Sequence, residues 1–182
     1  MNVTVFLGSV RGNRDVYKET ARAIGIGLAK DGHTLVFGGS KEGLMMDMAT
    51  AALENDGKVI GVVTESLFRT YGAVEGLTVL ELTKKMADRI SRMIELGEMF
   101  VVFPGGEGTL EEAATAMSIN KLMPKMRKHI FFLNLAGYYD GLETFFKKMS
   151  EESFAGEHFF NYCHFVTSLE EMNGMMKAIF AK

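Results

Sequence analysis

Short apolar runs alternate with longer segments of helical period along the 182-residue chain. Residues 2–7 (NVTVFL) are rich in β-branched and aromatic residues and predict a strand. Residues 14–30 place Val16, Ile24 and Leu28 on a helical stripe that stops before a glycine turn. The later strands are expected at 33–37, 58–63, 77–81, 99–103, 129–134 and 163–166, and the later helices at 43–55, 83–97, 109–121, 139–152 and 168–180. Residues 64–76 are expected to be irregular.

This alternation indicates parallel strands joined by right-handed helical crossovers. The strands are apolar almost throughout, which is typical of a sheet covered on both faces. The sequence therefore predicts an α/β protein, a Rossmann-like three-layer α/β/α sandwich with a mostly parallel sheet. We expect a single nucleotide-binding domain over residues 1–182, with its ligand at the carboxyl ends of the strands, where the strand order reverses.

Three of the predicted strands run into a glycine turn: VFLGS at 5–9, VFGGS at 36–40 and VVFPGGEGTLEE at 101–112. Glycine permits close approach of a ligand, and a turn that opens a helix presents free N–H groups to an anion. Gly105, Gly106, Gly108 and Thr109 are therefore candidate phosphate-binding residues. The spacing matches neither the dinucleotide fingerprint nor the nucleoside-triphosphate P-loop, and no lysine follows, so a monophosphate is the favoured guest.

A second interpretation of the same stretch needs no ligand. Thr109 and Glu112 have the spacing of a helix capping box, and spacing alone favours that cap. The three preceding glycines favour the anion site, because a cap does not require them. Ser168 and Glu171 have the same spacing without such glycines, and there we expect an ordinary cap.

Composition narrows the class of protein. Hydrophobic residues make up 47% and charged residues 24%, as in soluble globular proteins, and the net charge of −3 does not suggest a nucleic-acid partner. No apolar run is long enough to span a membrane, and the N-terminus resembles a first strand rather than a signal peptide. The single cysteine, Cys163, agrees with a cytoplasmic protein. His33, His129, His158 and His164 lack metal-ligand spacing, so they are expected to be structural and no metal is predicted.

The stretch PGGEGTLEE resembles the P-G-G-x-G-T-x-x-E motif of the LONELY GUY family. Other segments match that family in the same order: VFLGS, VFGGSKEGLM, MADRISRM at 86–93 and NLAGYYDGL at 134–142. The family comprises cytokinin riboside 5'-monophosphate phosphoribohydrolases, often labelled lysine decarboxylases. The resemblance covers most of the chain and implies hydrolysis of the N-glycosidic bond of AMP-like nucleoside monophosphates to free base and ribose 5-phosphate.

The resemblance also assigns roles. It implies Arg89 and Glu112 as catalytic residues, with Arg89 offering a planar fork to phosphate or ribose oxygens and Glu112 supporting the cationic sugar or the attacking water. Without the resemblance, Arg89 would be taken for a solvated surface residue. The family uses no cofactor or metal, and it commonly forms homodimers, here expected through helices 83–97 and 109–121. The implied phosphate- and substrate-binding residues are Gly8, Ser9, Gly105, Gly106, Gly108, Thr109 and Ser118.

The sequence departs from the family pattern at four places: Ile90 replaces a lysine, Ser40 a glycine, Met46 stands where a glycine often follows Leu-Met, and residues 118–121 lack the family's Trp and Gln. These departures leave the identity of the base open. Glu107 occupies a variable motif position and is expected to face solvent, because it would repel a phosphate. The alternative function is a non-catalytic carrier that binds a nucleotide or the molybdenum cofactor.

Overall fold

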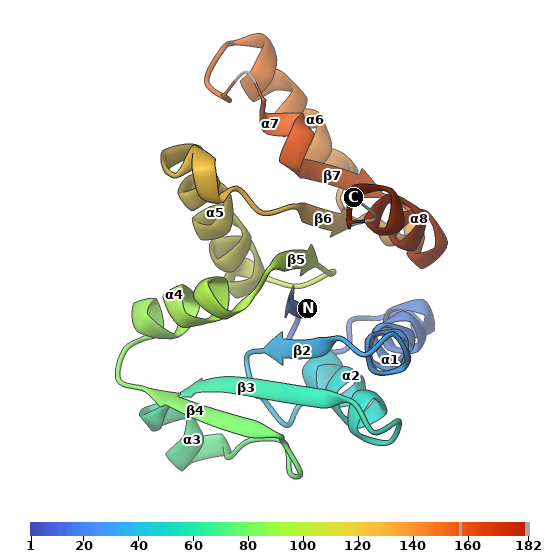
Figure 1. Ribbon diagram of the computed structural model, residues 1–182, viewed down its shortest axis with the longest axis vertical. Coiled ribbons are helices and arrows are strands. Elements are labelled where there is room, and N and C mark those ends of the chain that lie inside the picture. The colour runs from blue at the N-terminus through green and yellow to red at the C-terminus, as the bar shows by residue number, and fades with distance from the viewer. Residues whose placement is uncertain (157, 181–182) are drawn as a thin grey trace.

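The computed structural model describes residues 1–156 and 158–180. The predicted domain range also includes residues 157, 181 and 182, which lie outside the described part. The strands are β1 (Asn2–Phe6), β2 (Thr34–Phe37), β3 (Lys58–Thr64), β4 (Val79–Thr83), β5 (Met99–Val102), β6 (Ile130–Leu133) and β7 (Cys163–Val166). They form one sheet in the order β4-β3-β2-β1-β5-β6-β7, and every neighbouring pair is parallel (Figure 1).

The helices confirm the predicted alternation with two exceptions, the helices at Glu65–Tyr71 and Phe159–Tyr162, which were not predicted. They are α1 (Asp15–Lys30), α2 (Gly43–Leu53), α3 (Glu65–Tyr71), α4 (Met86–Leu96), α5 (Glu107–Leu122), α6 (Asp140–Glu151), α7 (Phe159–Tyr162) and α8 (Leu169–Phe180), with 3-10 turns at Pro124–Met126 and Leu135–Gly137. The expectation that residues 64–76 are irregular was wrong, because α3 lies there. Thr64 starts α3 by accepting a hydrogen bond from the Leu67 N–H at 3.3 Å, and no residue of this short helix is fully buried. Helix α3 therefore lacks the apolar stripe by which the six predicted helices were recognised.

Alternating strand residues build two apolar layers, one on each face of the sheet. In β1, Val3 and Val5 point to the layer covered by α1, α2 and α8, whereas Phe6 points to the layer covered by α4, α5 and α6. This arrangement confirms the predicted three-layer sandwich. Among the described residues, no helix is both long and apolar enough to cross a membrane.

The chain order reverses beside β1, which lies between β2 and β5. From β1 the chain builds outward to β4 on one side, and then returns to build β5, β6 and β7 on the other. The loops that follow β1 and β5 consequently meet, and the Gly8 N–H donates to the Pro104 carbonyl at 3.2 Å. The fold thus brings two of the three glycine turns into contact at the place where such sheets bind ligands.

Two histidines meet at the β6–β7 edge of the sheet. His129 Nδ1 and His164 Nε2 lie 2.9 Å apart, although 35 residues separate them in the chain. Burial lowers the pKa of both side chains, and that of His164 falls to about 4, partly through the neighbouring charge of His129. Within the described residues, no group of three or more histidine, cysteine or acidic side chains is placed to hold a metal ion.

Candidate active site

A cavity of about 510 Å³ opens at the carboxyl ends of the central strands. All three glycine turns contribute to it, together with α3 and the starts of α4 and α5. Its lining comprises Leu7, Gly8, Ser9, Gly38, Ser40, Glu42, Met45, Val63, Leu67, Tyr71, Gly72, Met86, Arg89, Gly106, Glu107, Gly108, Thr109 and Glu112.

Arg89 lies in the first turn of α4 and is only 7% exposed, so it is not a solvated surface residue. Its Nε donates to the Val62 carbonyl at 3.0 Å, and its Nη2 donates to the Gly38 carbonyl at 3.3 Å. Its Nη1 donates to Glu112 Oε1 at 3.0 Å and contacts the Met86 sulfur at 3.4 Å. All three guanidinium nitrogens are therefore engaged by the protein. The two Nη groups, which the family resemblance assigned to substrate oxygens, donate here to Glu112 and to the Gly38 carbonyl.

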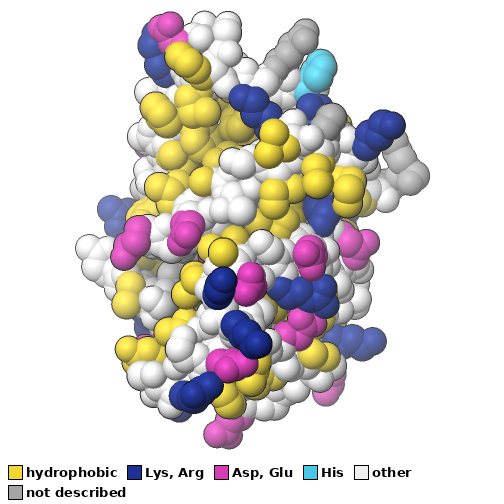
Figure 2. Space-filling model, turned by 90° about the vertical axis from the view of Figure 1, so that its left-hand side faces the viewer, with side chains coloured by type: hydrophobic (Ala, Val, Ile, Leu, Met, Phe, Trp, Pro, Cys, Tyr) yellow, Lys and Arg dark blue, Asp and Glu magenta, His cyan; other side chains and the backbone are white. Residues whose placement is uncertain are grey.

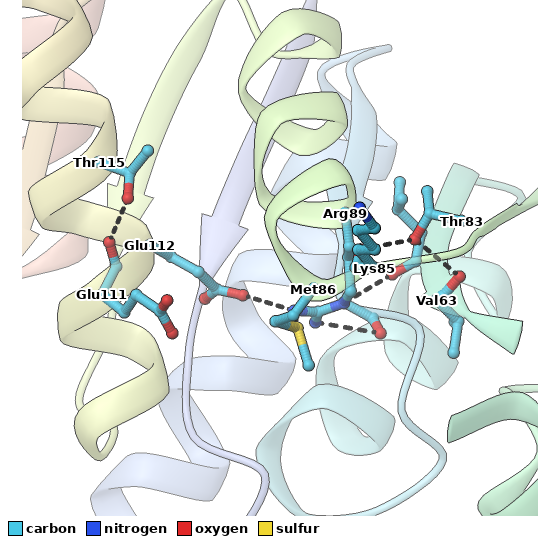
Figure 3. Close-up of polar contacts among 10 residues, drawn as sticks. Val63, Thr83, Lys85, Met86, Arg89, Glu111, Glu112 and Thr115 are labelled. Carbon is cyan, nitrogen blue, oxygen red and sulfur yellow. Dashed lines mark hydrogen bonds and ion pairs between the residues drawn. The ribbon is translucent and has the colours of Figure 1, made fainter. Parts of the chain in front are cut away.

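Glu112 extends from α5 to Arg89, and only 5% of the residue is exposed (Figure 3). Its neighbour Glu111 is exposed on another side of α5, since successive helical residues point about 100° apart. Burial raises the pKa of Glu112 above its ordinary value, while the charge and the hydrogen bond of Arg89 act in the opposite direction. The structure thus distinguishes the two adjacent carboxylates, which helical spacing alone could not.

The capping-box interpretation of Thr109 and Glu112 is wrong. Helix α5 starts earlier, with Gly106 as its N-cap, so Thr109 already lies within the first turn. The Glu112 carboxylate is bound to Arg89 instead of returning to a cap N–H.

At α8 the expected cap is confirmed. Ser168 Oγ accepts from the Glu171 N–H at 3.1 Å, and Glu171 accepts from the Thr167 N–H at 2.7 Å.

The start of α5 forms the floor of the cavity. The N–H groups of Gly106, Glu107, Gly108 and Thr109 have no acceptor within the helix, because its first bond runs from the Leu110 N–H to the Gly106 carbonyl. These N–H groups lie at the positive end of the helix dipole. Space is open beside Gly106 and Gly108, where a Cβ would meet nothing within 4 Å. Glu107 is exposed, as expected, but it stands at the rim of the cavity.

Gly105 lies directly behind this floor. A Cβ there would overlap the Thr109 hydroxyl and the Gly8 backbone, so this position requires glycine. Gly105 therefore allows the turns after β1 and β5 to touch.

The loop after β1 forms one wall. Gly8 and Ser9 line the cavity, and the Ser9 carbonyl packs so closely on Gly43 of α2 that a side chain could not be accommodated. Two residues further on, Arg11 forms a two-pronged ion pair with the buried Asp47, at 2.6 and 2.9 Å. This pair fixes the first loop to the start of α2.

Ser118 is the one predicted substrate-binding residue that lies elsewhere. It lines a second, mostly apolar cavity of about 470 Å³ between α5, α6 and α7. Ser118 lies six residues after Glu112 and does not line the cavity of the glycine turns.

Several lining residues were not among the predicted site residues. Gly38 belongs to the second glycine turn, and a Cβ there would collide with the Arg89 guanidinium. That turn was visible in the sequence, although its partner was not. Leu67 and Tyr71 come from α3, the helix that periodicity did not reveal.

The parallel sheet and the glycine-lined cavity at its switch point define a Rossmann-like α/β protein. Two solved structures share the fold. A molybdenum cofactor carrier protein of Chlamydomonas reinhardtii is 21% identical, with a TM-score of 0.74, over 100% of this chain and 98% of the other. A molybdenum cofactor binding protein of Rippkaea orientalis is also 21% identical, with a TM-score of 0.71, over 98% and 96%.

The sequence comparisons specify the family. Residues 45–176 match the family model described as "Possible lysine decarboxylase". A cytokinin riboside 5'-monophosphate phosphoribohydrolase of Rhodococcoides fascians is 36% identical over 84% of this chain and 77% of its own length. One of Arabidopsis thaliana is 33% identical over 84% and 71%. The chain therefore belongs to the LONELY GUY family.

Removing one partner of the buried ion pair should destabilise the fold strongly. We expect Arg89→Met to lower the free energy of unfolding by about 3–5 kcal/mol at pH 7, because Glu112 is left buried and uncompensated. Urea denaturation followed by circular dichroism measures the change. The double variant Arg89→Met/Glu112→Leu should lose less than Arg89→Met alone.

The control is the exposed pair of Arg69 with Glu65, which also lie 3.0 Å apart. Arg69→Met should cost no more than about 1 kcal/mol. Equal losses for Arg69→Met and Arg89→Met would show that the buried pair has no special role in stability.

Proposed function

We propose that this protein hydrolyses the N-glycosidic bond of AMP-like nucleoside 5'-monophosphates to free base and ribose 5-phosphate. One observation carries the proposal: α5 presents its free N–H groups and the Glu112 carboxylate to the same cavity. Thr109 and Glu112 are three residues apart and share a helix face, about 4.5 Å along the axis. That separation suits a 5'-phosphate at one end and the anomeric carbon at the other. The names of the relatives support the same reaction.

The residues divide the chemistry between them. The N–H groups of Gly106, Gly108 and Thr109 bind the phosphate and so place the ribose. Cleavage of the C–N bond builds positive charge on the sugar, and Glu112 stabilises that charge or takes a proton from the attacking water. Arg89 holds the Glu112 carboxylate in position and offsets its negative charge beside the phosphate.

The departures from the family pattern do not remove a contact of Arg89 or Glu112. Ile90 is 4% exposed and belongs to the apolar layer beneath α4, so it does not border the cavity. Ser40 does line the cavity, and its hydroxyl accepts from the Glu42 N–H at 3.3 Å. Leu67 and Tyr71 add an apolar wall. We infer that this wall contacts the base.

Base release tests the reaction. AMP and isopentenyl-AMP are incubated with the protein, and the products are separated by chromatography. We expect free base from the wild type, and a loss of about 10²–10³-fold in kcat for Glu112→Gln, which keeps an oxygen for Arg89 but removes the charge. Glu111→Gln is the matched control and should remain near wild type. Nucleotides that bind and are recovered intact would favour the carrier function instead.

The acid limb of the pH profile tests the role of Glu112. If its ionised form acts, kcat/KM falls as the pH drops through its pKa, and the raised pKa places that midpoint above the ordinary 4.5. Glu111→Gln should move the midpoint downward, because the charge of Glu111 also raises the pKa of Glu112. An acid limb with its midpoint at or below pH 4.5 would contradict the requirement for an ionised Glu112.

We also propose a cytoplasmic homodimer, and the exposed side chains support a revised interface. Helix α4 turns Ile90, Met93 and Ile94 into its own core, so it offers little apolar surface to a partner. Hydrophobic side chains instead gather on the upper part of the α5 side of the molecule (Figure 2). We define this α5–α6 apolar face by its exposed residues: Leu110, Leu122, Met123, Phe145 and Phe154. Such a face is typical of a protein interface.

Analytical ultracentrifugation tests this interface. The wild type should sediment as a dimer, and Phe145→Lys should shift it toward monomer, because Phe145 is 58% exposed on the apolar face. Leu82→Lys is the control, since Leu82 is 48% exposed but lies on β4 at the opposite end of the sheet. A monomeric wild type would exclude the dimer, and an unchanged Phe145→Lys would exclude this interface.

A further inference from the structure

Two tyrosines behind the cavity donate hydrogen bonds to the glycine turn that forms its floor. Tyr138 Oη donates to the Gly105 carbonyl at 2.7 Å, and Tyr139 Oη donates to the Phe103 carbonyl at 2.8 Å. Both come from the loop after β6, within the segment NLAGYYDGL. Neither tyrosine lines the cavity. Their hydroxyls therefore contact the turn from outside the cavity lining.

The bond from Tyr138 determines how the next N–H group is directed. The described backbone has no cis peptide bond, so the Gly105 carbonyl and the Gly106 N–H point in opposite directions. With that carbonyl held toward Tyr138, the Gly106 N–H points away from the tyrosine. Gly106 is the N-cap of α5 and lines the cavity.

The orientation of this peptide matters because the cavity offers an anion little else. Among the described lining residues, Arg89 is the one lysine or arginine, and its charge is offset by Glu112. Backbone N–H groups must then supply the attraction. Glycine peptides rotate easily. No atom lies within 4 Å of the position that a Cβ on Gly106 would occupy, so packing at this position does not restrain the peptide. An external hydrogen bond is therefore needed to keep this N–H in place.

The loop that carries Tyr138 is itself firmly built. Asn134 Oδ1 accepts from the Tyr139 N–H at 2.6 Å, and Asn134 Nδ2 donates to Asp140 at 2.7 Å. The Tyr138 ring packs edge-on against Tyr17 and Tyr139, with ring centroids 6.1 and 4.9 Å away. The hydroxyl thus reaches Gly105 from a constrained ring, although Tyr138 is 45% exposed.

We propose that Tyr138 is a positioning residue that presets the Gly105–Gly106 peptide to bind the phosphate of the substrate. This inference rests on the proposed function for the identity of the substrate. It predicts that loss of the hydroxyl weakens phosphate binding specifically and leaves the chemical step intact.

The test compares Tyr138→Phe with the wild type. Calorimetry measures the affinities of ribose 5-phosphate and of adenosine, and the base-release assay gives kcat and KM for AMP. We expect the ribose 5-phosphate affinity to fall and the KM to rise by about three- to tenfold, as for loss of one hydrogen bond. The adenosine affinity and kcat should change less than twofold. Tyr17→Phe is the matched control, because it removes a hydroxyl from the same aromatic cluster that does not contact the turn.

Each outcome decides the inference. Unchanged ribose 5-phosphate binding in Tyr138→Phe overturns it, as does an equal loss of adenosine binding, which would indicate general disruption. If the wild type releases no base but Tyr138→Phe still binds ribose 5-phosphate more weakly, the proposed reaction fails and the role of Tyr138 stands. A wild type that binds no ribose 5-phosphate overturns the inference about Tyr138, and base release from AMP still decides the proposed reaction separately.

Discussion

The buried pair of Arg89 and Glu112 is the interaction on which the site depends. Two charges in the interior are tolerated only when geometry and additional hydrogen bonds offset the loss of water. Here Val62 and Gly38 supply carbonyl oxygens to the guanidinium, and Gly38 can do so only because it has no Cβ. The pair thereby joins β3, the turn after β2, α4 and α5 around one cavity. A change in any of these elements changes the carboxylate's surroundings.

In the proposed site, the same pair allows two negatively charged groups, the Glu112 carboxylate and a phosphate, to lie close together. A bare carboxylate one helical turn from a phosphate site would repel the phosphate. In the proposed site, Arg89 offsets that charge while its guanidinium is engaged by Val62, Glu112 and Gly38, and the phosphate is assigned to backbone N–H groups at the start of α5. Because these groups are dipoles of the main chain, their strength depends on orientation rather than on titration. This explains why so much of the surrounding structure holds backbone carbonyls in place, at Pro104 and Gly105 in particular.

The sequence predicted the parts of the molecule that have a local signature. Apolar periodicity located the strands and six of the eight described helices, missing α3 and the short α7, and glycine spacing located the floor of the cavity. The partners of Arg89 could not be found this way, because strand carbonyls carry no sequence signal. The meeting of His129 with His164 depends on the register of β6 with β7, which spacing does not reveal. Helix α3 was missed because it buries no residue completely, and Ser118 was assigned from the motif helix although its side of α5 faces another cavity.

The positions at which this chain departs from its family differ in whether they border the proposed active site. Ile90 lies in the apolar layer, and Ser118 to Lys121 follow the second cavity, so neither change removes a contact of Arg89 or Glu112. Ser40 alone borders the proposed active site, on the side where α3 adds Leu67 and Tyr71. In the proposed reaction, bond cleavage depends on the floor of the cavity and on the buried pair, whereas discrimination among bases depends on this wall. We therefore expect the reaction of the family, with a preference among bases that is determined by α3 and its surroundings.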